Sequence, residues 1–321
     1  MKRLTKSLLV LLVTSAGCTR EDPAKEHAVE ERPAAEHPVE VKVAAIQCSS
    51  VMGDVDGNRR KLMALVEEAA THGAKIIVLP EAAITGYLSQ DLHTNWQLEG
   101  WPIEAEYNGR DPTSIAETVP GPSTQQFGTL AKRLGVYVTV PFVEIDRTSS
   151  PPSLFNTVCL VSPKGEVVAH YRKLTPWPVP EKSWATPGDR GVQTYDTEYG
   201  RVGLAICYDI HTILEKYRPY DLWALLYPIA WVDTNHPAEW FWHVLPSQVA
   251  PFHHYLIGAN WSVDEPQPWF GYGFSTIISP GGEVLASARS LHGSEIVYAT
   301  IPTASARQHA SPIDPASSSA P

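Results

Sequence analysis

Three residues with chemically useful side chains, Glu81, Lys173 and Cys207, each follow a stretch that is typical of a strand. The stretches are "KIIVLP" before Glu81, "VVAHYR" before Lys173 and "RVGLAI" before Cys207. A cysteine attacks as its thiolate, and a carboxylate within hydrogen-bond reach can take the thiol proton. A lysine ammonium beside them would stabilise the thiolate and then the oxyanion formed at a carbonyl. Together they predict acyl transfer through a cysteine with a lowered thiol pKa, and no histidine is needed.

Each of these residues also has a simpler interpretation when it is taken alone. Glu81 fits a surface loop carboxylate, Lys173 a solvated lysine at a strand end, and Cys207 a buried core cysteine. Cys48 and Cys159 lie inside strand patterns, and we interpret both as core residues. The three candidates gain weight as a set because all of them lie at the carboxyl ends of predicted strands, where α/β sheets assemble active sites.

The elements that must position these residues follow from the hydrophobic periodicity. Strands are predicted over 40–47, 75–79, 136–145, 202–207, 222–228, 255–261, 273–279, 283–288 and 294–301, with a hairpin over 155–173. Helices are predicted over 58–72, from Ser123 to Gly135, and within 236–253. Ser123 and Gln126 have the spacing of a capping box, which predicts that the second helix begins at Ser123. Helices that alternate with apolar strands and hairpins indicate an α/β fold with a mixed sheet. The long loops 91–122 and 175–199 carry tryptophans, which favours pocket walls.

The two ends of the chain differ in composition from the domain between them. Residues 1–18 combine basic residues, the apolar run "LLVLLV" and small residues before Cys18, which is the layout of an export signal. This order resembles a bacterial lipoprotein signal, although Ser15 stands where leucine is usual; ordinary signal cleavage is the alternative. Residues 19–39 are charged and rich in Ala, Pro and Glu, and they predict a flexible tether. We therefore expect a membrane-anchored lipoprotein of the bacterial cell envelope, with a domain over 40–302 and a disordered tail over 303–321.

Charge and residue usage exclude several function classes. The net charge of −10 and the lack of a basic stripe oppose binding to nucleic acid. Three cysteines besides Cys18 do not make a disulfide framework, and a free thiol in an exported chain favours a functional role. The histidines His211, His236, His243, His253 and His254 match no tight metal-ligand spacing, so a metal-dependent hydrolase is disfavoured. A lipid-tethered binding protein with an inactive site is a further alternative.

Four motifs in order resemble the nitrilase or carbon–nitrogen hydrolase superfamily over residues 41–302. They are "VAAIQ", "VLPEAAITGY", "NTVCLVSPKGEVVAHYRK" and "YGRVGLAICYDI". The resemblance implies an αββα four-layer sandwich, a homodimer, no cofactor, and a triad of Glu81, Lys173 and Cys207. It also implies a second glutamate beyond the lysine that positions substrate, and "WPVPEKSWATPGD" offers Glu181 for this role.

The chain departs from many members of that family directly after the cysteine. It has "CYDIHTILEKY" where an arginine and a Pro-Glu pair are frequent, and its "CYDI" and "YPIAW" are closer to the biotinidase and pantetheinase branch. We expect hydrolysis of a non-peptide C–N bond in a small amide through a thioester on Cys207, and a nitrilase acting on a nitrile is the alternative. Substrate binding is assigned to four residues: Tyr87, Trp177, Tyr208 and Trp231.

Overall fold

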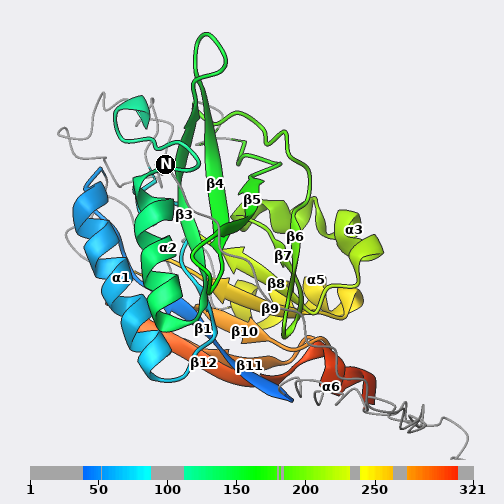
Figure 1. Cartoon of the computed structure of the whole chain (residues 1–321). Coiled ribbons are helices and arrows are strands. Elements are labelled where there is room, and N and C mark those ends of the chain that lie inside the picture. Colours follow the sequence, from blue (N-terminus) through cyan, green and yellow to red (C-terminus); the bar gives the residue numbers. More distant parts are fainter. Residues whose placement is uncertain are drawn as a thin grey trace, which may run out of the picture. The chain divides into compact units, whose positions relative to one another are not determined.

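Two mixed sheets form the centre of the fold. The structure is a computed structural model, and it describes residues 39–51, 53–87, 112–178, 181, 184–231, 239–262 and 273–309. The first sheet has six strands in the order β12-β1-β2-β3-β4-β5, and the second has six in the order β11-β10-β9-β8-β7-β6 (Figure 1). The strands are β1 (Glu40–Gln47), β2 (Ile76–Val78), β3 (Tyr137–Asp146), β4 (Ser153–Val161), β5 (Val167–Arg172), β6 (Thr194–Thr197), β7 (Gly200–Leu204), β8 (Ala224–Pro228), β9 (Tyr255–Ala259), β10 (Thr276–Ile278), β11 (Val284–Ser287) and β12 (Glu295–Pro302).

Helices flank the sheets on both sides. They are α1 (Val55–Thr71), α2 (Pro122–Leu134), α3 (Leu214–Tyr217), α5 (Leu245–Val249) and α6 (Ala304–His309), with short turns η2 (Pro112–Ser114), η4 (Cys207–His211), η5 (Arg218–Tyr220) and η7 (Ala250–Phe252) and the π-helix η6 (Trp240–Val244). Figure 1 shows α1 and α2 beside the first sheet, and α3 and α5 beside the second. None of the helices in the described ranges is both long and apolar enough to cross a membrane.

The alternation of side chains along β1 explains why the layers stack in this way. Ala44 and Ile46 point to one face and join the apolar cluster that α1 and α2 complete. Val43 and Ala45 point to the other face and join a second cluster, shared with strands of the second sheet. Because successive side chains of a strand face opposite sides, a strand that is apolar at every position is suited to a layer between two others. The expected αββα sandwich is confirmed.

The elements differ from the expectations at several points. The helix predicted from Ser123 begins at Pro122 and is capped by Gly121 and Thr124, so the expected capping box is wrong. Proline is suited to the first turn because its missing N–H has no intrahelical partner there. The Ser123 hydroxyl instead donates to Glu117. Part of the loop expected over 175–199 forms strand β6.

The expected disordered tail also needs correction at its start. Thr303 is fully buried, and its backbone N–H donates to the carbonyl of Val39 at 3.0 Å. Residues 304–309 continue as helix α6. The remaining tail from residue 310, the expected signal over 1–18 with Cys18, and the tether up to residue 38 lie outside the described residues.

Candidate active site

The three candidate residues lie just beyond the ends of three strands from the two sheets. Glu81 follows β2, Lys173 follows β5 directly, and Cys207 opens the short helix η4 that follows β7. The backbone N–H of Glu81 donates to the carbonyl of Ile229 beyond β8, so this glutamate links the first sheet to the second. The predicted placement at strand ends is therefore confirmed for all three residues.

Lys173 lies between two glutamates. Its ammonium nitrogen is 2.7 Å from Oε1 of Glu81 and 2.5 Å from Oε2 of Glu181. All three side chains are buried, with exposed fractions of 1% or less. Burial opposes the charge of Lys173, but the two carboxylates outweigh it and raise the pKa of this lysine above its usual value. Lys173 is therefore a permanent cation that holds two acids in a dry site.

Asn156 bridges the same two carboxylates and was not singled out in the sequence. Its side-chain Nδ2 donates to Oε1 of Glu81 at 2.7 Å and to Oε1 of Glu181 at 2.6 Å. Its backbone carbonyl accepts from the N–H of Lys173 at 2.8 Å. One residue of β4 thus contacts both carboxylates and the backbone of Lys173. The signal in the sequence is the position of Asn156 in the strand that pairs with β5, next to Lys173.

Glu181 belongs to the site and not to a solvated loop surface. Its side chain is fully buried and also accepts a 2.5 Å hydrogen bond from the backbone N–H of Trp177. The phenol of Tyr87, 1% exposed, also hydrogen bonds with this carboxylate. Of the residues assigned to substrate binding, Tyr87 and Trp177 therefore contact Glu181 directly. Four donors enclose this carboxylate, so Glu181 is not a solvated loop residue.

Cys207 lies in a sharp turn, with its backbone in the left-handed region at a φ of 41°. This conformation is strained for a residue other than glycine and is typical of functional positions. The hydroxyl of Tyr227 donates to the carbonyl of Cys207 at 2.7 Å, and the backbone of Ala230 hydrogen bonds with the cysteine. Unlike Glu81 and Lys173, Cys207 is partly exposed. The turn therefore places the cysteine beside a buried acid–base set.

The pKa of the Cys207 thiol is raised, which corrects the expectation of a lowered value. Burial is the largest cause, and the Glu81 carboxylate adds to it; Lys173 opposes both. Burial also raises the pKa of Glu81, with Lys173 opposing it. The resting cysteine is consequently a thiol, and it faces a carboxylate with an increased proton affinity. Such a pair suits proton transfer during attack and does not suit a standing thiolate.

Asp209 is a second residue that only the structure reveals. Its buried carboxylate accepts from the hydroxyl of Tyr171 at 2.6 Å, from the N–H of Thr175 at 2.8 Å and from the N–H of Ile206 at 3.2 Å. Burial raises its pKa to about 7, while Lys173 and these hydrogen bonds lower it. Asp209 thereby ties the cysteine turn to the segment that carries Lys173.

A second set of contacts supports Lys173 from outside. The neighbouring Arg172 is buried, pairs with Glu144 and Asp189, and has its guanidinium 3.8 Å from the centre of the Phe155 ring. The N–H of Gly188 donates to the carbonyl of Lys173 at 2.8 Å. A Cβ at position 188 would lie 2.1 Å from the Arg172 carbonyl, so this approach requires glycine. The Pro-Gly-Asp stretch thus fastens the loop that carries Glu181.

The other two residues assigned to substrate binding lie next to the cysteine. Tyr208 follows it on η4 and packs edge-on against His211, with ring centres 5.3 Å apart. Trp231 follows Ala230, and its backbone N–H donates to Asn260 at 2.9 Å. Both side chains are partly exposed. Their role in substrate binding stays a prediction.

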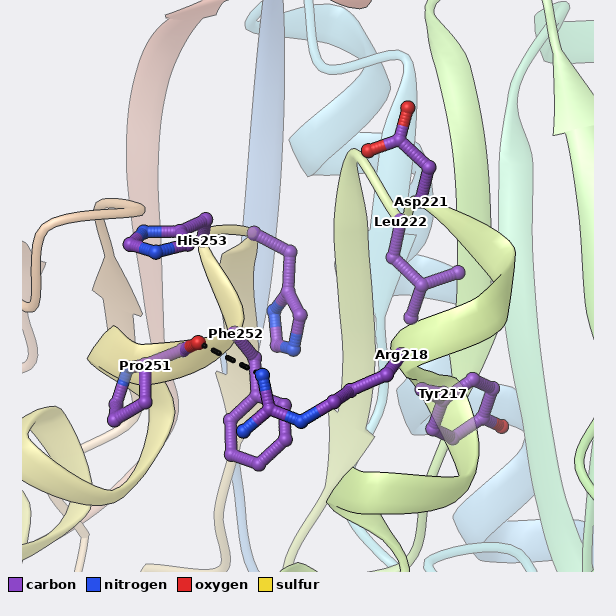
Figure 2. A pocket seen from close by; sticks show the side chains of 8 residues that line it. Tyr217, Arg218, Asp221, Leu222, Pro251, Phe252 and His253 are labelled. Carbon is purple, nitrogen blue, oxygen red and sulfur yellow. Dashed lines mark hydrogen bonds between the residues drawn. The ribbon is translucent and has the colours of Figure 1, made fainter.

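Of the histidines that were weighed as metal ligands, His236 lies outside the described residues, and the other four are His211, His243, His253 and His254. Within the described residues, no group of three or more His, Cys, Asp or Glu side chains is arranged to hold a metal ion. His253 and His254 line a separate cavity of about 270 Å³, together with Arg218 and Phe252 (Figure 2). There the Arg218 guanidinium lies 4.4 Å from the ring centre of Phe252 and donates to the carbonyl of Pro251 at 3.4 Å.

Comparisons with known proteins show the family and agree with this fold. The sequence profile of the carbon–nitrogen hydrolase family matches residues 42–310. Omega-amidase NIT2 of Homo sapiens is 30% identical over 267 residues, which cover 80% of this chain and 86% of that protein. Among solved structures, Nit3 of Saccharomyces cerevisiae, a member of branch 10 of the nitrilase superfamily, has a TM-score of 0.67 and 22% identity, covering 84% of this chain and 92% of that one.

A third similar protein is an amidase from Nesterenkonia sp. AN1. Its mutant structure has a TM-score of 0.64 and 18% identity to this chain, over 84% of this chain and 94% of that one. That structure shows covalent addition of the acetamide moiety of fluoroacetamide at its active-site cysteine.

Proposed function

The chain belongs to the carbon–nitrogen hydrolase family, and from this premise we propose that it hydrolyses a small, non-peptide amide through a thioester on Cys207. The observation that carries the proposal is the ammonium of Lys173 bound by two buried carboxylates, Glu81 and Glu181, beside a partly exposed cysteine. The covalent adduct on the cysteine of the Nesterenkonia amidase supports the same chemistry. The acid–base groups that the reaction needs are all side chains of this chain, so the proposal requires no cofactor.

In the first half of the reaction, Glu81 takes the proton of the Cys207 thiol while the sulfur attacks the amide carbon. A C–S bond forms, and the former carbonyl oxygen becomes an oxyanion. Lys173 and the backbone N–H of Tyr208 hold that oxyanion. Collapse of this intermediate breaks the C–N bond, and Glu81 returns its proton to the leaving amine. The acyl group remains on Cys207 as a thioester.

The second half of the reaction repeats these roles with water. Glu81 takes a proton from water as its oxygen attacks the thioester carbon, and the C–S bond breaks. The carboxylic acid leaves, and the proton returns to the sulfur of Cys207. Glu181 fits a positioning role in both halves because Lys173 and Asn156 hold its carboxylate in place.

Release of ammonia or amine from a panel of amides, ureides and nitriles tests this function. We expect turnover of an amide, loss of that turnover in Cys207→Ala, and an acyl adduct on Cys207 by mass spectrometry. Activity should be lost with a thiol alkylator and kept with a chelator, which separates a thiol enzyme from a metal hydrolase. An active Cys207→Ala variant would end the proposal, and turnover of nitriles alone would favour the nitrilase alternative.

We further propose that the enzyme is exported and anchored in the bacterial cell envelope by a lipid on Cys18. The order of basic, apolar and small residues before Cys18 supports this, with 19–39 as the tether and 40–302 as the hydrolase domain. The change Cys18→Ser should release the protein into the soluble fraction. A wild-type protein that is soluble and has an unmodified N-terminus would refute the anchor. The family resemblance also supports a homodimer, which sedimentation would test.

A further inference from the structure

Four aromatic side chains gather next to the cysteine turn, and we call Tyr208, His211, Trp231 and Trp240 the aromatic cluster. Tyr208 and His211 lie on η4, the short helix that Cys207 opens. Trp231 is the residue after Ala230, whose backbone hydrogen bonds with Cys207. Two separate segments therefore bring aromatic rings to the side of the sulfur.

The rings of the cluster are in mutual contact. Trp231 and Trp240 are stacked, with ring centres 4.3 Å apart and planes 12° from parallel. His211 lies 5.1 Å from Trp240 and 6.5 Å from Trp231, and Tyr208 lies 5.3 Å from His211. All four residues have some exposed surface, whereas the neighbouring Phe241 is completely buried. The cluster is therefore an aromatic surface beside the nucleophile and not part of the core.

The charges near this surface disfavour an anionic ligand. The buried acid–base set has two carboxylates, Glu81 and Glu181, against one ammonium, Lys173. Burial lowers the pKa of His211, so this ring is neutral at pH 7. No arginine or lysine of the described ranges stacks on the cluster; the two cation–ring contacts there lie on Phe155 and Phe252. A carboxylate on the substrate would add a further negative charge beside Glu81 and Glu181, which is costly.

The two tryptophans also carry hydrogen-bond capacity that the described residues leave unused. The indole Nε1–H groups of Trp231 and Trp240 are buried and have no acceptor among those residues. A buried N–H without a hydrogen-bond partner is destabilising. A flat ligand with a carbonyl or ring nitrogen, inserted against this pair, would supply an acceptor. A ligand whose only polar group is an ammonium would not, because an ammonium has no acceptor for an N–H.

From these observations we infer that the preferred substrate carries an uncharged, planar group next to its scissile amide, of the aryl or heteroaryl carboxamide class. The aromatic cluster would bind that group by stacking and edge contacts. This inference rests on the proposed amide hydrolysis at Cys207 and adds the substrate class. We therefore expect the enzyme to prefer amides with a flat, neutral acyl group over amides with a terminal carboxylate or a saturated ring.

Steady-state kinetics of the full-length enzyme on four primary amides tests the substrate class. The panel is nicotinamide, cyclohexanecarboxamide, succinamate and acetamide, which differ in planarity, charge and size. Aromatic contacts predict that kcat/KM for nicotinamide exceeds that for cyclohexanecarboxamide by about 2- to 10-fold. Succinamate should be poorer still because of its charge. A preference for succinamate, or equal rates for the planar and saturated rings, would overturn the inference.

Two tryptophans of the same π-helix provide a matched pair of variants. Trp240 stacks on Trp231, whereas Trp242 is 49% exposed and packs on Phe274. Trp240→Leu should lower the ratio of kcat/KM for nicotinamide to that for acetamide by about 2- to 10-fold. Trp242→Leu should leave the ratio unchanged. Equal ratios in both variants would remove the cluster from substrate selection.

The two levels of the proposal fail in different ways. Turnover of acetamide with no preference for nicotinamide would refute only the substrate class. Release of ammonia from none of the amides, together with no acyl adduct on Cys207, would count against amide hydrolysis itself.

Discussion

The side-chain amide of Asn156 donates a 2.7 Å hydrogen bond to Glu81, a residue 75 positions earlier in the chain. The same amide nitrogen donates to Glu181, so one donor group fixes the directions of two carboxylates. A carboxylate that serves as base for Cys207 must hold its position to a fraction of an ångström. The bridge formed by Asn156 therefore ties the geometry of the acid–base set to strand β4.

We predict that Asn156→Ala lowers kcat by about 10²-fold, because a displacement of about 1 Å at a reacting group can cost that much. Asn58→Ala is the matched control: Asn58 is also buried, and its amide donates to the carbonyls of Val51 and Ile84. Each variant should lose about 1–3 kcal/mol of folding free energy. Kinetics at a temperature where both variants are folded measures the difference, and equal kcat values would show that Asn156 has only a structural role.

Glu181→Gln should lower kcat by roughly 10²-fold or more, since it removes the charge of an orienting group. Contrary to the expectation for a loop residue, it should also lower the melting temperature, because it breaks a buried ion pair with Lys173. Glu117→Gln serves as control, since Glu117 is likewise buried and paired, with Arg59. A melting loss in both variants with near-normal kcat for Glu181→Gln would assign Glu181 to structure alone.

Alkylation of Cys207 by iodoacetamide should accelerate with pH up to and beyond 8 without reaching a plateau, because burial and Glu81 raise the pKa of this thiol. Turnover should fall in step with modification. Cys159→Ala removes a fully buried cysteine of β4 and should keep kcat while costing about 1 kcal/mol of stability. A plateau in the alkylation rate below pH 7 would instead indicate a standing thiolate.

Activity should rise through about pH 7 as Asp209 ionises, because only its carboxylate accepts all three hydrogen bonds around the cysteine turn. The hydrogen bond from Tyr171 lowers the pKa of Asp209, so Tyr171→Phe should move the acid limb of the kcat profile to higher pH. Tyr217→Phe is the control, since the Tyr217 hydroxyl donates to the carbonyl of Gln193 and not to Asp209. A midpoint that is the same in all three proteins would exclude Asp209 as the titrating group.

The same group has the opposite effect on folding. Its pKa in the folded protein, about 7, is higher than its ordinary value of 3.8, so the folded state binds this proton more readily than the unfolded state does. Ionised Asp209 thus destabilises the fold above about pH 7, and this cost disappears as the pH falls towards 3.8. Urea denaturation at pH 6 and pH 8 should show a smaller pH dependence in Asp209→Asn.

The sequence by itself determined most of the strands and helices and the three strand-end residues, whereas the four-layer arrangement was implied by the family resemblance. Strand and helix periodicities are local, and a strand that is apolar at every position must be covered on both faces. Glu81, Lys173 and Cys207 could be found because each is a polar residue that interrupts such a pattern at its end. The start of α2 was misplaced because Pro122 and Gly121 determine that helix end more strongly than the spacing after Ser123.

Only the tertiary structure decided how these groups interact. Asn156 and Asp209 lie within segments whose patterns give no sign of their contacts, and Glu181 resembles any loop glutamate until the sheets assemble around it. The pKa of Cys207 is raised by burial and by the Glu81 carboxylate, which follows a strand of the other sheet. Neither cause can be read from the residues next to the cysteine. Protonation states and hydrogen bonds in this site are set by segments distant in sequence that packing brings within a few ångströms, so no local pattern could have predicted them.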